Sequence, residues 1–92
     1  MPNTTPSKAI KNIVLATLLT NGGTITEPNV IYSAVGSVFP SMERNFDDLT
    51  YAVRWTRMSL ANEGFIAPSK TRGTWTLTAK GRKAARAFFL AN

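Results

Sequence analysis

The spacing of apolar residues changes once along this 92-residue chain, from a helical period to a strand period. Up to Glu63 the apolar residues recur at intervals of three or four, which places them on one face of an α-helix. Residues 74–78 then alternate strictly, with Trp75 and Leu77 on one side and threonines on the other. This single switch predicts a set of helices followed by a small sheet, with a last helix behind it.

Four segments combine the helical period with residues that favour helix ends. The predicted helices are Lys8–Thr20, Pro28–Val38, Phe46–Glu63 and Ala79–Leu90. Residues that favour the N-cap position stand before three of them, at Ser7, Thr26 and Thr78. Glycines that suit a helix C-terminus follow the first and the third. Between the second and third helices, Pro40 stops the helix and Ser41–Asn45 is predicted as a loop.

Short β-compatible segments lie between these helices. Thr24-Ile25 is predicted as a very short strand, and Phe65–Ala67 and Thr74–Thr78 as the two strands of a β-hairpin with a basic tip. The resulting order, α-β-α-α-β-β-α, is that of a winged helix-turn-helix, a mainly α fold in which the hairpin is the wing. We expect a polar leader over residues 1–6, one winged-helix domain over residues 7–90, and a tail over residues 91–92.

The third predicted helix has a clear core face. The expected places of the two tryptophans follow from their positions relative to the neighbouring core residues. The core line is Phe46, Leu49, Val53, Thr56 and Leu60. Trp75 is in phase with Leu77 and is expected in the core, whereas Trp55 is expected to pack against the hairpin near Phe65. These positions favour packing over a cage for a flipped base.

The first predicted helix is apolar on two sides. One face holds Ile10, Ile13, Val14 and Thr17, and Leu15 and Leu19 lie opposite. This helix is therefore either buried on both sides or forms part of an interface.

Composition argues against several classes of function. The chain has no Cys and no His, so disulfide frameworks, thiolate or imidazole metal sites and His-dependent hydrolases are disfavoured. Asp47 and Asp48 are adjacent on a helix and point about 100° apart, so they make no catalytic pair. We expect no enzymatic activity and no cofactor.

The apolar stretch Ile13–Leu19 is too short to cross a bilayer. We therefore expect no membrane partner and a cytoplasmic or nucleoid-associated protein.

Charge points to double-stranded DNA as the partner. Eleven Lys and Arg against five Asp and Glu give a net charge of +6, and the segment from Lys70 to Arg86 has six basic residues and no acid. The outward face of the third helix carries Tyr51, Arg54 and Met58 where a solvated face would carry Lys and Glu. Arg pairs with guanine in the major groove, and Tyr or Met can touch a thymine or modified-cytosine methyl. The predicted DNA-binding residues are Thr50, Tyr51, Arg54, Arg57, Met58, Lys70, Thr71, Arg72, Lys80 and Arg82.

Two segments resemble a known family. Trp55, Leu60, Gly64 and Phe65-Ile66, and then Arg72-Gly73 followed by Gly81-Arg82, have the spacing of the N-terminal domain of Mrr-type restriction proteins. The resemblance covers Leu49 to Lys83 and implies a winged-helix module that reads DNA, often attached to a nuclease that acts on modified DNA. A small transcriptional regulator is a second use of the same module.

A different class of function fits some of the same residues. The alternative for Tyr51 and Met58 is packing under a neighbouring loop or a second chain. The alternative for the whole domain is a protein–protein adaptor. A homodimer would then use the apolar residues Leu15, Leu19, Phe88, Phe89 and Leu90.

Overall fold

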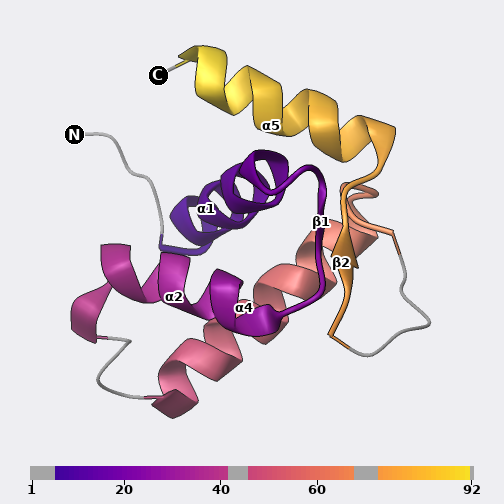
Figure 1. Ribbon diagram of the computed structural model, residues 1–92. Helices are drawn as coiled ribbons and strands as arrows, with labels where there is room; N and C mark the ends of the chain where they lie inside the picture. Colours follow the sequence, from indigo (N-terminus) through magenta and orange to yellow (C-terminus); the bar gives the residue numbers. More distant parts are fainter. Residues whose placement is uncertain (1–5, 42–45, 68–72, 92) are drawn as a thin grey trace.

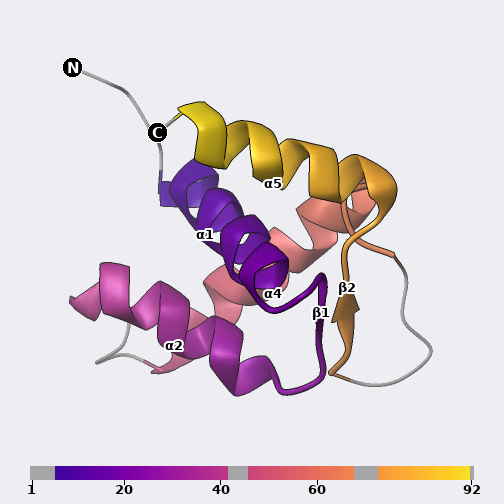
Figure 2. The ribbon, with the colours of Figure 1, turned by 45° about the horizontal axis from the view of Figure 1, so that its top comes forward.

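The computed structural model describes residues 6–41, 46–67 and 73–91 of the chain (Figure 1). Over these ranges the protein is mainly helical, with a small antiparallel sheet, as the sequence predicts. The elements are α1 (Pro6–Thr20), β1 (Thr24–Ile25), α2 (Pro28–Val38), α4 (Phe46–Asn62), β2 (Trp75–Thr76) and α5 (Ala79–Ala91). Helix α1 lies at the centre and packs against α2, α4 and α5 (Figure 2).

The helix starts differ from the sequence predictions at two caps. Helix α1 begins at Pro6, so Ser7 lies inside it and is not the N-cap. Helix α2 begins at Pro28, and its N-cap residue is Glu27 rather than Thr26, without a side-chain capping bond. Proline fixes a helical φ and lacks an N–H, so it favours the first helical position whatever residue precedes it.

The limits of helical structure also differ from the prediction just before α4 and at its end. The backbone is helical at Pro40 and Ser41, where a loop was predicted from Ser41 onward, while the rest of that loop falls outside the described residues. Helix α4 ends at Asn62, one residue before the predicted end. The earlier end of α4 is within the fraying expected at helix ends, whereas Pro40 and Ser41 are helical beyond Phe39, the non-helical C-cap of α2.

Helices α1 and α4 end in the same glycine motif. After α1, Gly22 N–H donates to the Leu19 carbonyl at 3.2 Å and Gly23 N–H to the Leu18 carbonyl at 2.7 Å. After α4, Gly64 and Phe65 make the equivalent bonds, to the carbonyls of Ala61 at 3.1 Å and Leu60 at 2.9 Å. Gly22 and Gly64 both have φ of 82°, which glycine adopts without steric cost. These Schellman motifs confirm that glycines end the first and third predicted helices.

Strand β2 pairs with β1, which the hairpin prediction did not include. The strands are antiparallel, with Thr24 opposite Thr76 and Ile25 opposite Trp75. On the other edge of β2, residues 65–67 contribute an isolated bridge between Ile66 and Leu77 instead of a full strand. Backbone bonds on that edge join Ala67 N–H to the Thr76 carbonyl at 2.9 Å and Thr78 N–H to the Phe65 carbonyl at 3.0 Å. The described sheet is therefore centred on β2.

The core lies between α1 and the elements around it. Its most buried large side chains are Val14, Leu18, Ile31, Val35, Val53 and Leu60. The predicted core face of α4 is confirmed at Leu49, Val53, Thr56 and Leu60, and the side chain of Phe46 lies outside the described residues.

Helix α1 is buried on both sides, which decides between the two alternatives drawn from the sequence. Leu15 is only 4% exposed and packs inside the monomer, so its assignment to a dimer contact was wrong. Leu19 is half-buried against the same core. The side chains of Phe88, Phe89 and Leu90, the other predicted dimer contacts, lie outside the described residues.

Helix α5 is held against the sheet by its first turn. Thr78 Oγ1 accepts a bond from Gly81 N–H at 3.0 Å, which confirms Thr78 as the N-cap, and donates to the Gly64 carbonyl at 2.6 Å. Gly81 packs so closely on the Phe65 carbonyl that a Cβ at this position would overlap it. The absence of a side chain at Gly81 thus lets α5 lie close to the end of α4.

Candidate nucleic-acid interface

The side of α4 opposite the core presents an unusual set of exposed side chains. Tyr51 is 64% exposed, Trp55 53% and Met58 50%, and Arg54 is exposed among them. With spacings of three and four residues, these side chains form one stripe along the helix, which we call the α4 outer face. The predictions that Tyr51, Arg54 and Met58 point away from the core are confirmed.

Trp55 belongs to this face, and its expected packing against the hairpin was wrong. Its ring meets the Tyr51 ring edge-on, with centroids 6.0 Å apart and an interplanar angle of 65°. The reason is helical geometry, because Trp55 lies two residues, or about 200°, from Val53 in the core line. The exposed position of Trp55 was predictable from the sequence, because Tyr51, Trp55 and Met58 recur at helical spacing on the side opposite the core line.

Arg54 is the cation of the α4 outer face. Among the described residues its guanidinium makes no hydrogen bond and no ion pair. A guanidinium has five N–H donors and can form two parallel bonds to a suitable acceptor pair. The donors of Arg54 are therefore accessible to a partner, on the same side of the helix as two exposed aromatic rings and Met58.

Thr50 and Arg57 lie at the edge of this face. Thr50 is half-buried, and its hydroxyl oxygen has no hydrogen-bond partner within the described part of the chain. Arg57 is half-buried with its guanidinium carbon 5.3 Å from the centroid of the buried Trp75 ring. Such a cation–π contact holds the side chain against the protein. The structure thus separates these two residues from the exposed Tyr51, Arg54 and Met58.

The two predicted DNA contacts on α5 also have partners inside the protein. Lys80 Nζ lies 5.3 Å from the centroid of the Phe65 ring. Arg82 Nη2 donates to the Gly22 carbonyl at 3.2 Å and closes over the turn that follows α1. Lys83 and Arg86, further along α5, are exposed. Lys70, Thr71 and Arg72, the predicted wing-tip contacts, lie outside the described residues.

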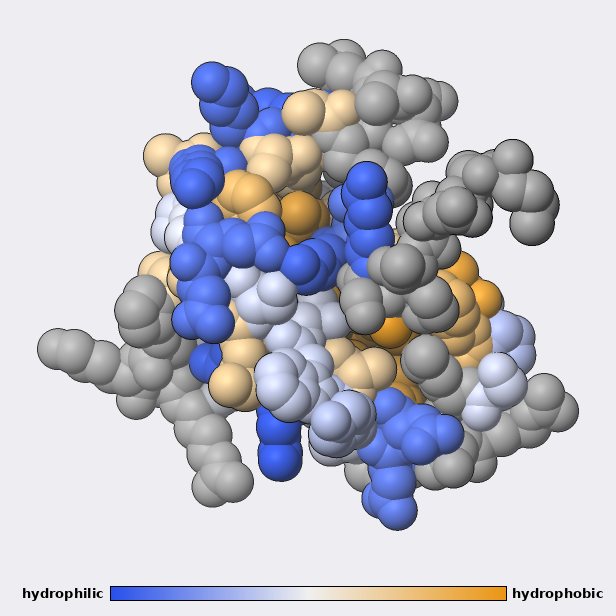
Figure 3. All heavy atoms as spheres, turned by 180° about the vertical axis from the view of Figure 1, so that it is seen from behind, coloured by the Kyte–Doolittle hydropathy of each residue, from blue (hydrophilic) through white to orange (hydrophobic). Residues whose placement is uncertain are grey.

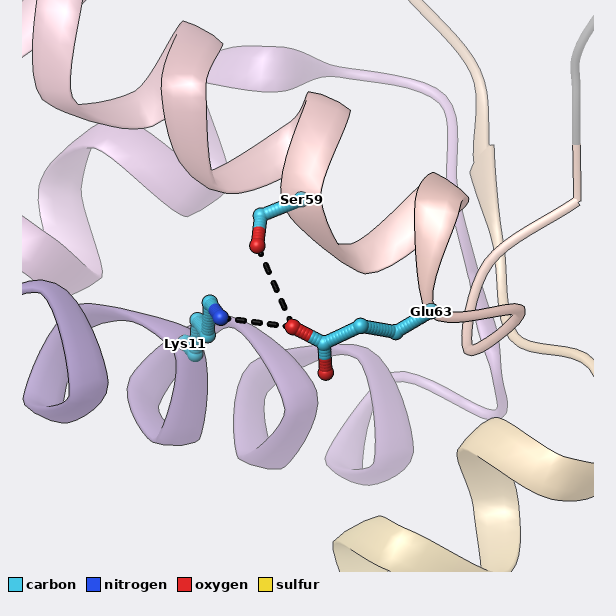
Figure 4. Close-up of polar contacts among 3 residues, drawn as sticks. All are labelled: Lys11, Ser59 and Glu63. Carbon is cyan, nitrogen blue, oxygen red and sulfur yellow. Dashed lines mark hydrogen bonds and ion pairs between the residues drawn. The ribbon is translucent and has the colours of Figure 1, made fainter.

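An ion pair joins the end of α4 to α1 (Figure 4). Lys11 Nζ donates to Glu63 Oε1 at 2.6 Å, and Ser59 Oγ donates to the same oxygen at 3.1 Å. The bond from Lys11 is the main cause that lowers the pKa of Glu63 below its ordinary value, with smaller help from Ser59 and the charge of Lys80, while desolvation opposes it. Lys11 is therefore occupied in positioning α4.

The wider surface around α4 is of mixed polarity. Helix α4 passes behind α1 in Figure 2, and the view from behind in Figure 3 shows blue hydrophilic side chains among pale and cream ones. The first turn of α4 adds the exposed acids Asp47 and Asp48, which suit the positive end of the helix dipole. The α4 outer face is thus bordered by acidic residues at the start of the helix.

Metal binding, membrane insertion and a ligand pocket have less support in the described residues. They contain no group of three or more acidic, His or Cys side chains placed to hold a metal ion. None of their helices has the combined length and apolarity needed to cross a bilayer. An open hollow of about 200 Å³ is lined by Asn21, Thr24, Ile25, Thr26, Glu27 and Val30, and its single charge is an acid.

Comparisons of the chain with protein-family models, curated proteins and solved structures find no match.

Proposed function

We propose that this chain is a winged-helix module that binds double-stranded DNA, with α4 in the major groove. The observation that carries the proposal is the α4 outer face, where Arg54 shares an exposed side of the helix with Tyr51, Trp55 and Met58. An α-helix with its side chains is about 10–12 Å across, and the major groove of B-DNA is about 12 Å wide. A helix that exposes such a face on a basic domain fits this groove.

The arrangement of the elements supports the winged-helix topology. Helices α2 and α4 pack on each other in the order of a helix-turn-helix, in which the second helix is the one that enters the groove. Strand β2 pairs with β1 on one edge, and Leu77, the residue that follows β2, forms a bridge with Ile66 on the other. The two described arms of the predicted hairpin are thus joined to each other and to β1, as the base of a wing requires.

Charge decides how the proposed complex is oriented. The net charge of +6 favours association with phosphates, and Lys83 and Arg86 on α5 are exposed cations for backbone contact. Asp47 and Asp48 repel phosphates at the start of α4. We therefore place the DNA against the middle of the helix, from Arg54 to Met58, and not against its first turn.

The test is a fluorescence-anisotropy titration with random-sequence duplex DNA at 50 and 200 mM salt. We expect binding that weakens with salt, with a log–log slope of about −0.9 for each phosphate contacted. Arg54→Ala should weaken binding clearly, whereas Lys11→Ala removes the same charge from a residue held by Glu63 and should change it little. Folded protein that gives a flat trace at low salt would contradict the proposal.

The resemblance to Mrr-type proteins supports a narrower proposal, that the module reads modified DNA. Matched methylated and unmethylated duplexes test it, and equal affinities would contradict it while leaving duplex binding intact. A transcriptional regulator would instead bind a palindromic site as a dimer.

A protein–protein adaptor is the second candidate, and the exposure of Trp55 favours it. Tyr, Trp, Met and Arg are the residues enriched at protein interfaces, and all four stand on the α4 outer face. This function predicts no binding to duplex DNA at low salt. It also predicts that Trp55→Ala, made on the exposed surface, abolishes association with a partner without loss of stability.

A further inference from the structure

We propose that the α4 outer face reads thymine methyl groups beside a guanine, an inference that rests on the proposed binding to duplex DNA. Arg54 would pair with the guanine, and Trp55 with Met58 would cover the methyl groups. The proposal assigns a specificity role to Trp55, which was expected to pack against the hairpin and is 53% exposed in the structure.

The length of the face sets how many bases it can cover. From Tyr51 to Met58 the helix rises by about 10 Å, at about 1.5 Å per residue. Base pairs are spaced at about 3.4 Å along each strand, so the face spans about three base steps. Within this stretch Arg54 is the only exposed cation, and the stretch contains no Asn or Gln. One guanine is therefore the natural partner of Arg54, because Arg binds guanine O6 and N7 with two parallel bonds.

The remaining side chains select thymine by their apolar surface. The thymine C5-methyl is the one apolar group that the four bases present in the major groove. Placing Trp55 or Met58 against the polar edge of guanine, cytosine or adenine would remove water from donors and acceptors without replacing their hydrogen bonds. Covering a methyl group instead buries apolar surface on both partners. Both side chains are half-exposed and available for this contact.

The shape of this surface favours a duplex over an unpaired strand. Sites for single-stranded nucleic acid combine stacking rings with a groove lined by cations. The α4 outer face is instead the convex side of a helix with one cation, and the ring of Trp55 is already in edge-on contact with Tyr51.

The experiment uses two duplexes of the repeat dG-dT paired with dA-dC, one natural and one with deoxyuridine in place of every thymidine. The pairs, charges and hydrogen-bonding groups are the same, and only the methyl groups are missing. In this repeat every docking register places a thymine next to a guanine. We expect the protein to bind the natural duplex at least about fourfold more tightly, the effect of burying one methyl-sized group.

Variants assign the effect to the residues. Trp55→Ala and Met58→Ala should each reduce the ratio of the two affinities, and the double variant should bring the affinities to the same value. Val38→Ala, which truncates a side chain that is 57% exposed on α2, is the matched control and should leave the ratio unchanged. Circular dichroism of each variant shows that it is folded.

Three results would overturn the inference, and they separate it from the proposed function. Equal affinity of the wild-type protein for both duplexes, with binding still dependent on salt, rejects methyl reading and leaves duplex binding in place. Tighter binding to the single dG-dT strand than to either duplex indicates base stacking instead. Absence of binding to all three probes rejects both the inference and the proposed function.

Discussion

The α4 outer face and the junction where α5 meets the sheet contain the same kinds of residue in opposite arrangements. In the junction, Trp75 is 4% exposed with Arg57 over its ring, and Lys80 lies over the ring of Phe65. On the α4 outer face, Trp55 is 53% exposed and Arg54 has no partner among the described residues. Aromatic and basic side chains thus stabilise one region and remain accessible in the other.

The difference shows that the number of basic residues is a poor measure of a DNA-binding surface. Arg57, Lys80 and Arg82 count equally with Arg54 in the net charge, yet each of them contacts a ring or a carbonyl of its own chain. A cation held in this way must give up its contact to move onto a phosphate. The exposed Arg54 has no such contact to lose.

The largest effect is expected from the two tryptophans. Trp75→Ala should lower the free energy of unfolding by about 3–5 kcal/mol, because it leaves a cavity in the core and removes the ring under Arg57. Trp55→Ala should lower it by less than about 1 kcal/mol, since it loses only the exposed edge-on contact with Tyr51. Urea unfolding followed by circular dichroism measures both, and equal losses would contradict the assignment of Trp55 to the surface.

The junction between α5 and the sheet can also be disrupted at the contact between Gly81 and the Phe65 carbonyl. Gly81→Ala should destabilise the protein by about 3 kcal/mol, because the added methyl group overlaps the Phe65 carbonyl and forces α5 away. Gly22→Ala is the control, since a Cβ there meets nothing within 4 Å and only the positive φ is strained. We expect it to cost about 1 kcal/mol in the same unfolding measurement. A smaller loss for Gly81→Ala than for Gly22→Ala would refute the tight packing of α5.

Binding to DNA should distinguish the arginines of the two regions. Arg54→Ala should weaken binding to random-sequence duplex by about tenfold or more, the size of a lost contact to a base. Arg82→Ala should weaken it by less than about threefold, because its guanidinium already binds the Gly22 carbonyl. Fluorescence anisotropy at a single salt concentration compares the affinities of the two variants for DNA. A larger loss of affinity for Arg82→Ala than for Arg54→Ala would contradict the distinction between the two regions.

The smallest effect concerns Glu63, at the end of α4 where the two regions meet. Because its pKa is lowered in the folded protein, the ion pair with Lys11 stabilises the fold above the unfolded pKa and is lost as the pH falls through the folded one. The side chains are 29% and 39% exposed, so we expect less than about 1 kcal/mol. Glu63→Gln should therefore be destabilising at neutral pH and indistinguishable from wild type in acid. Urea unfolding at both pH values tests this, and an equal loss of stability at neutral and acid pH would contradict it.

The sequence by itself determined the local structure of this protein. The helices of the described residues lie close to the segments predicted from apolar spacing, and Gly22, Gly64 and Thr78 end or begin them as expected. These features depend on residues a few positions apart, whose dihedral preferences and hydrogen bonds act within one turn. The outward direction of Tyr51, Arg54 and Met58 follows from the same helical period.

Only the tertiary structure decided which distant residues meet. Strand β2 pairs with β1, and Arg82 reaches Gly22 across 60 positions of sequence. Leu15 is buried because helices pack on both sides of α1, and Trp55 stays exposed because no described element covers the outer side of α4. Apolar spacing states which side chains share a face, but the partner of that face is set by the packing of the whole chain.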